Sequence, residues 1–305
     1  TNFVSAYAEA IGAYALREID PVLSRYALRI AREDFGFAEA GSKEDAALPF
    51  NNDPGQAEVK LYAAAVSAAA ELARAGLAEF EEIAARYARL LMECQQTEYP
   101  EWDKPIRGFF WSDRAHRMPW HHAHHSFEQY LTAGLSALCD ILPTHPDRPL
   151  WVNALKLYCE YSKTAACYST PWGMLPEGIY HEDEAIHYPE ETLAGIIAGD
   201  EENLRAFKQQ VHKGIPLGSG YYLRRFPVWF SFRGNLNVML SQATALAAAA
   251  NVVGDAEALS LVQRQLEWTV GKNPFAQSLI TGEGYEWTDE YAVQPGQSIG
   301  QMPVG

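Results

Sequence analysis

The chain has 305 residues, 48% of them hydrophobic, which is enough for one large core or two modest domains. Its formal net charge of −15 argues against a nucleic-acid partner, because phosphates require a basic face. The sequence contains no run of 18 apolar residues, so we expect no membrane-spanning helix and no membrane partner.

Apolar residues recur at helical spacing through the first third of the chain. Four helices are predicted there, over residues 3–19, 21–40, 57–75 and 78–96. Asp20 and Pro21 are typical of a helix start, with a capping carboxylate followed by proline in the first turn. A polar turn cluster at 51–55 separates the second helix from the third, and Gly76 ends the third.

Helices also dominate the rest of the chain. Five more are predicted, over residues 126–142, 146–168, 190–210, 234–253 and 255–270. Three segments between helices, 107–125, 170–184 and 218–235, concentrate aromatic and charged residues instead. Only 221–232 has the character of a strand or hairpin. The sequence therefore predicts about nine helices and almost no β-structure.

Helix pairs joined alternately by short turns and long, chemically rich loops indicate an all-α fold, a toroid of helical hairpins of the (α/α)6 type. In such a barrel the long loops gather at one end, and function concentrates on loops held by a rigid scaffold. We expect one domain over residues 1–305. Six hairpins contain twelve helices, so about nine helices predict an incomplete barrel that is part of a longer protein.

The loop at 107–125 is rich in histidine and tryptophan. Five of the nine histidines lie in it: His116, His121, His122, His124 and His125. Adjacent histidines seldom reach one ion together, and no paired motif such as HExxH accompanies them, so we predict no metal site and no cofactor. The histidines either hydrogen-bond a ligand or bond helix-end carbonyls. We expect Trp111, His121 and His122 to contact substrate, and Glu128 to orient an imidazole from the following helix.

The loop at 170–184 offers an aromatic ring and a carboxylate. Trp172 precedes a glycine, which predicts an exposed ring of the kind that stacks on sugar faces. Glu177 lies between Pro176 and Gly178, on a rigid turn that fixes a carboxylate. The alternative is that Trp172 fills the barrel and Glu177 caps a helix.

The loop at 218–235 interleaves arginines with aromatic residues. Its arginines are Arg224, Arg225 and Arg233. Arginine binds carboxylates in a bidentate manner, so in this acidic chain the cluster indicates an acidic ligand such as a uronate. The alternative is that these arginines neutralise the chain's own acids. The residues expected to line the substrate here are Tyr222, Arg225, Trp229 and Arg233.

The four cysteines, Cys94, Cys139, Cys159 and Cys167, lie in apolar stretches and form no CxxC pair. We predict buried free thiols, with a Cys159–Cys167 bridge as the alternative.

The last predicted helix ends in the stretch WTVGKNPFAQSLITGEGY at 268–285. Together with the helix before it, this stretch resembles a late segment of glycoside hydrolase family 9, where a helix ends in a phrase like YxxGxNPxxxSxxTGxG. The matching residues are Trp268, Gly271, Asn273, Pro274, Ser278, Thr281, Gly282 and Gly284. The match covers about thirty residues.

The resemblance implies a six-hairpin barrel in a secreted or periplasmic enzyme that hydrolyses β-linked glucans with inversion, using two carboxylates. The family's Asp-Ala-Gly-Asp motif is absent, since the nearest string, at 254–257, begins a helix. The family's later histidine-arginine motif is replaced by Trp-Thr-Asp-Glu at 287–290, and its general acid lies beyond the TGxG loop. No catalytic residue of the family can therefore be transferred to a position of this chain.

From these residues we predict a domain that binds a carbohydrate substrate and hydrolyses a β-glycan. The favoured catalytic carboxylates are Glu283 and Glu177, both on glycine-flanked turns where packing would desolvate the acid. Tyr285 is expected to contact the sugar. One alternative is a polysaccharide lyase that uses Tyr222 or His122 with arginine on a uronate. Another is a carbohydrate-binding barrel without a catalytic pair.

Overall fold

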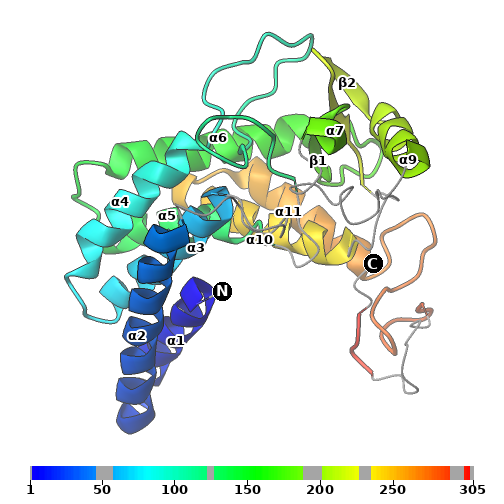
Figure 1. Cartoon of the computed structure of the whole chain (residues 1–305). Helices are drawn as coiled ribbons and strands as arrows, with labels where there is room; N and C mark the ends of the chain where they lie inside the picture. The colour runs from blue at the N-terminus through cyan, green and yellow to red at the C-terminus, as the bar shows by residue number, and fades with distance from the viewer. Residues whose placement is uncertain are drawn as a thin grey trace.

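The structure is a computed structural model, and it describes residues 2–45, 58–121, 127–187, 201–226, 235–288 and 299–302. It is mostly helical, with little strand, which confirms the all-α prediction in its general form (Figure 1).

Among the described residues, eight helices form four antiparallel hairpins. They are α1 (Asn2–Leu16) with α2 (Pro21–Asp45), α3 (Glu58–Arg74) with α4 (Phe80–Glu93), α5 (Tyr130–Ile141) with α6 (Arg148–Ala166), and α10 (Asn235–Val253) with α11 (Ala256–Thr269). Each lies within a few residues of its predicted range. The predicted cap at Asp20 is confirmed, because its carboxylate accepts from the N–H groups of Val22 and Leu23 at 3.1 and 3.0 Å.

The first helices of successive hairpins pack side by side, α1 on α3, α3 on α5 and α5 on α10, so the hairpins follow one another in a curved row (Figure 1). Residue pairs fix the direction of α5 and α10. The Thr132 hydroxyl donates to the Ala245 carbonyl at 2.8 Å, and the Gln129 N–H donates to the Ser241 hydroxyl at 3.1 Å. The two helices therefore run parallel, and their N-termini lie on the same side of the row of hairpins. We call this the loop end.

A three-stranded antiparallel sheet lies in the connection between α6 and α10. It consists of β1 (Gly178–His181), β2 (Ile215–Gly218) and β3 (Tyr221–Arg224), in the order β1-β3-β2. The short helix α7 (Glu184–His187) and α9 (Glu201–His212) separate β1 from β2. The sequence indicated only the β3 region, and the two strands that pair with it, of four residues each, were not predicted.

The two faces of this sheet differ in chemistry. Ile179 and Leu223 are cross-strand partners, and both join a buried apolar cluster with Ile106 and Phe109 of the preceding loop. The opposite face carries the pairs Gly178↔Arg224 and Tyr180↔Tyr222. Because side chains alternate along a strand, the apolar face anchors the sheet, whereas the other face carries Arg224 together with Tyr180, which is buried in a cluster with Phe207 and Val211 of α9. We call this other face the polar face.

One described segment, Leu236–Val253 of α10, is long and apolar enough to pass a length-and-composition test for a membrane span. Half of it is buried, and α10 packs on α5, α6 and α11. We interpret it as the core helix of the hairpin row.

All four cysteines are unpaired, so the Cys159–Cys167 alternative is wrong. Cys94, Cys139 and Cys159 are buried as predicted, whereas Cys167 is exposed because it follows the last turn of α6.

Candidate functional site

Two hydrogen bonds of the backbone fix the position of Glu177 just before β1. Its N–H donates to the Arg224 carbonyl at 2.9 Å, which extends the β1–β3 pairing by one residue. The preceding Pro176 carbonyl accepts from the Gln242 side chain of α10 at 2.9 Å. The side chain is 2% exposed. The expected burial of this carboxylate is therefore confirmed, and its turn is fixed between the sheet and a core helix.

His121 lies directly over the polar face. Its ring stacks on Tyr180, with centroids 4.0 Å apart and planes 14° from parallel. Gly178 is the residue beneath it, and a Cβ added there would lie 2.9 Å from the His121 Cβ. The glycine after Glu177 thus permits the loop carrying His121 to approach the carboxylate-bearing turn.

Glu184 supplies a carboxylate to His121. The His121 Nε2 lies 2.8 Å from the Glu184 Oε1, and the two side chains are 5% and 0% exposed. At this distance the contact is an ion pair when the imidazole is protonated. The other Glu184 oxygen accepts from the His181 N–H at 3.0 Å. The second ring nitrogen, Nδ1, is buried and has no hydrogen-bond partner among the described residues.

Glu128 is a second buried carboxylate, just before α5 at the loop end. It is 3% exposed, and its Oε2 accepts from the Phe127 N–H at 2.9 Å. Its Oε1 has no partner among the described residues. Burial raises the pKa of Glu128 to about 7, hydrogen bonds to the charged form oppose that rise, and the nearby charge of Glu177 adds to it. The two carboxyl groups are therefore close enough to influence each other.

Arg224 is the buried arginine of the third loop. It is 5% exposed and lies on the polar face opposite Gly178. Burial lowers the pKa of Arg224, while the charges of Tyr180 and Glu177 act to raise it. The prediction selected Arg225, which is exposed. The end of the strand makes the difference, because Arg224 is the last residue of β3 and pairs with Gly178, whereas Arg225 follows the strand.

The other predicted contact residues have diverse placements. Trp172 is 39% exposed as predicted, and its ring forms a T-shaped pair with that of Trp268, with centroids 5.8 Å apart. Tyr222 is half-buried on the polar face, with its ring centroid 5.0 Å from that of His212. Three predicted residues, His122, Trp229 and Arg233, lie outside the described residues.

Trp111 does not present a face to a ligand. It is 6% exposed, its ring stacks on His116 at 5.3 Å, and its Nε1 donates to the Gln96 side chain at 2.9 Å. Loop packing accounts for all of these contacts, and little of the ring is exposed, so the expected contact of Trp111 with substrate stays a prediction.

Glu283 and Tyr285 lie on the surface. Glu283 is exposed, and Tyr285 is fully exposed at 105%. The expectation that packing desolvates the Glu283 carboxylate is therefore wrong. The glycines beside it give a sharp turn, but no element of the described part of the chain covers the side chain.

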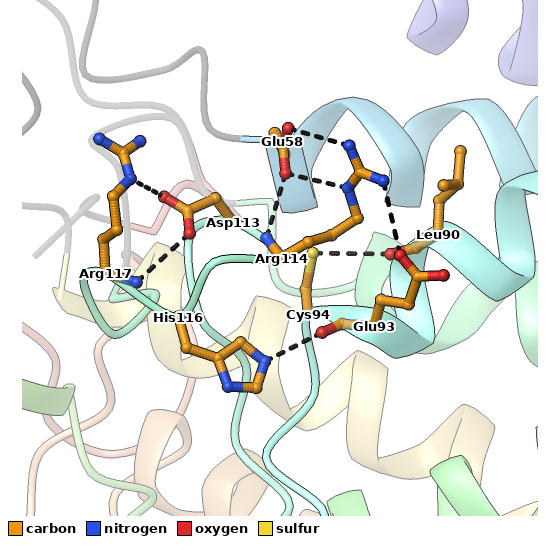
Figure 2. A network of polar contacts seen from close by, with 8 residues as sticks. All are labelled: Glu58, Leu90, Glu93, Cys94, Asp113, Arg114, His116 and Arg117. Atoms are coloured by element: carbon orange, nitrogen blue, oxygen red, sulfur yellow. Dashed lines mark hydrogen bonds and ion pairs between the residues drawn. The ribbon is translucent and has the colours of Figure 1, made fainter.

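His116 belongs to a polar network that fastens the histidine loop to the scaffold (Figure 2). Its Nε2 bonds the Glu93 carbonyl, at the last residue of α4, at 2.9 Å. Arg114 binds the Glu58 carboxylate at the start of α3 through its side chain and its N–H. Asp113 accepts from Arg117 at 2.7 Å. For His116 the structural alternative, bonding a helix-end carbonyl, is confirmed.

No group of three or more metal-binding side chains is present in the part of the chain that the structure describes. No protein-family model, curated protein or solved structure matches the chain. The candidate site is therefore defined by its own residues: Glu128, Glu177, His121, Glu184, Tyr180 and Arg224. It combines three buried carboxylates with two basic groups, a set that serves proton transfer to and from a bound ligand.

Proposed function

We propose that this chain is a glycoside hydrolase-like domain of the (α/α)6-barrel type that cleaves a β-linked polysaccharide or oligosaccharide by two-carboxylate acid/base hydrolysis. One observation carries the proposal. Glu128 and Glu177 are both buried at the loop end, and the charge of Glu177 contributes to raising the pKa of Glu128 to about 7. Glycosidases of this kind need one protonated and one ionised carboxyl group at neutral pH.

The roles follow from the surroundings of each group. Glu128 keeps its proton to higher pH because it is buried, which suits the general acid. Glu177 lies near Arg224, and a neighbouring positive charge favours the ionised form, which suits the general base. Both groups are buried, and a difference in the charges around them is the usual basis for dividing acid and base roles.

In the proposed step, Glu177 takes a proton from a water molecule as the water oxygen bonds to the anomeric carbon. The bond from that carbon to the glycosidic oxygen breaks, and Glu128 gives its proton to the departing oxygen. The reaction inverts the anomeric configuration, as the resemblance to family 9 implies. Both carboxyl groups return to their starting states by exchanging a proton with solvent.

The scaffold supports the same proposal. α5 and α10 run parallel, so both N-termini lie at the loop end. Glu128 precedes α5 there, and the turn that carries Glu177 is bonded to α10 through the Pro176 carbonyl and the Gln242 side chain. Trp172, in the same loop as Glu177, is partially exposed and offers a ring on which a sugar face can stack. A secreted or periplasmic location accords with a polysaccharide substrate.

The test is turnover on a panel of β-linked glycans by the wild-type chain, Glu128→Gln and Glu177→Gln, with reducing sugar as the readout. We expect hydrolysis of at least one glycan and its loss in both variants. Full activity in either variant would contradict the assigned roles. Binding of a glycan without turnover by the wild-type chain would favour a carbohydrate-binding barrel.

The second candidate is a polysaccharide lyase, favoured by the gathering of His121, Tyr180 and Arg224 on one side of the sheet. Arginine would neutralise a uronate carboxylate, and a basic group would remove the proton from the adjacent carbon. The electron pair would form a carbon–carbon double bond as the glycosidic oxygen leaves with a proton from an acid. The unsaturated product absorbs ultraviolet light, whereas a hydrolase product does not.

A further inference from the structure

In the His121–Glu184 pair at the polar face, the Nδ1 atom of His121 has no hydrogen-bond partner among the described residues. Glu184 is 1% exposed, and a carboxylate so deeply buried requires a cation or a proton. His121 lies at ion-pair distance from it, 2.8 Å. When Glu184 is ionised, the imidazolium is the form that compensates its charge.

An imidazolium donates from both nitrogens. In His121, Nε2 faces Glu184, while Nδ1 is buried without a hydrogen-bond partner among the described residues. A buried donor without a hydrogen-bond partner is unfavourable, and an unfilled ligand position is one explanation for it. The ring has little freedom to avoid this cost, because it is stacked on Tyr180 and its own Cβ lies close above Gly178.

A second basic group lies on the same face. Arg224 is cross-strand to Gly178, the residue directly beneath His121, and is 5% exposed. Two positively charged donors from different elements, the histidine loop and β3, therefore converge on one face of the sheet. Hydrogen bonds from charged donors to a carboxylate are roughly twice as strong as neutral ones.

We infer that the site takes a sugar bearing a carboxylate, a uronate residue, and that His121 donates from Nδ1 to that carboxylate with Glu184 as its fixed counter-charge and Arg224 beside it. This rests on the proposed function, since it names the class of sugar that the same site accepts. His121 is the contact residue, and Glu184 is a positioning residue that acts through it.

The first arm of the test changes only the ligand. Binding of oligogalacturonate and oligoglucuronate trisaccharides to the wild-type chain is measured by calorimetry, beside the same trisaccharides with their carboxyl groups reduced to alcohols. We expect at least one free acid to bind roughly tenfold more tightly than its reduced form, the equivalent of one charge-assisted contact. Equal or tighter binding of the reduced forms, or no binding of any uronate, would overturn the inference.

The second arm changes the protein. His121→Gln keeps a polar side chain but removes the charge, and we expect it to lose the preference for the free acid. His145→Gln is the matched control, because His145 also stacks on an aromatic ring, Trp151 at 4.8 Å, and pairs with a carboxylate, Glu82 at 3.7 Å, but lies in the α5–α6 turn away from the loop end. It is expected to keep the preference.

A preference retained in a folded His121→Gln would contradict the role of this residue. If that variant does not fold by circular dichroism, Glu184→Gln and the ligand arm decide the question, because neither removes the imidazole. Hydrolysis of neutral glycans without a uronate preference would sink this inference and leave the proposed function standing. Tight uronate binding without any hydrolysis would do the reverse.

Discussion

An alanine Cβ at Gly178 would lie 2.9 Å from the Cβ of His121, closer than side chains normally pack. Gly178 also has a backbone φ of +142°, a conformation that L residues rarely adopt. These two facts tie the carboxylate-bearing turn to the histidine above it. The geometry of Glu177 and the position of His121 therefore depend on the same glycine.

Replacing Gly178 with alanine is expected to destabilise the chain and to reduce ligand binding. The matched control is Gly76→Ala, because Gly76 also has a positive φ, +106°, but an added Cβ meets nothing within 4 Å. Backbone strain of about 1–2 kcal/mol applies to both variants. We expect Gly178→Ala to lose about 1–3 kcal/mol more from the clash, measured by urea unfolding. Equal losses in the two variants would show that the close approach to His121 is unimportant.

The division of roles between the carboxylates gives a second prediction. Glu128→Gln and Glu177→Gln should each lower turnover by roughly 10²–10⁴-fold, the usual contribution of a general acid or base. Glu283→Gln, at an exposed carboxylate, should remain within about twofold of wild type. Because Glu128 must be protonated and its pKa is about 7, wild-type activity should decline as the pH rises above 7. A large loss in Glu283→Gln alone would relocate the chemistry to the C-terminal loop.

Proton nuclear magnetic resonance of the first-formed product supplies an independent check on the mechanism. Hydrolysis by an acid and a base acting on a water gives the inverted anomer. Appearance of the retained anomer first would mean that one carboxylate attacks the sugar directly.

The long helices could be predicted from the sequence because their signals are local. The apolar spacing and the Asp20 cap lie within the segments that they define, and Asp255 likewise accepts from the Ala258 N–H at 3.0 Å at the start of α11. The sheet could not be predicted in the same way. β1 and β2 have four residues each, too few for a period-2 pattern, and contain Gly178 and Pro216, which usually indicate loops. Both form because they pair with β3.

The site was only partly predictable for a related reason. Glu177 stands out because proline and glycine flank it in the sequence. Glu128 carries no such local mark, and it is buried by tertiary packing of the segment before α5, where Gln129 contacts Ser241 of α10. Arg224 and Arg225 are indistinguishable by composition, and only the register of β3 turns the first toward the polar face.

The raised pKa of Glu128 has a consequence for stability. Its pKa is about 7 in the folded chain, against 4.5 for the ordinary group. Between these values the folded chain keeps a proton that the unfolded chain has released, so the free energy of unfolding falls as the pH rises from about 4.5 to 7. The full effect of this group is about 3 kcal/mol.

Glu128→Gln should remove that component, because glutamine does not titrate. We expect the difference in unfolding free energy between variant and wild type to shift in favour of the variant by about 3 kcal/mol from pH 4 to pH 8, measured by urea denaturation at each pH. At pH 4 the wild-type carboxyl is neutral in both states, which provides the reference. A difference that stays constant across this range would show that Glu128 is not desolvated.

Two tryptophans allow the same substitution to separate binding from packing. Trp172→Ala removes a ring that is 39% exposed, so it should change stability by less than about 1 kcal/mol and weaken glycan binding by roughly tenfold. Trp111→Ala removes a ring that is 6% exposed and packed on His116, so it should cost about 3–5 kcal/mol of stability. Thermal denaturation and calorimetric titration with a bound oligosaccharide measure the two effects. Unchanged affinity in Trp172→Ala would exclude it as a stacking platform.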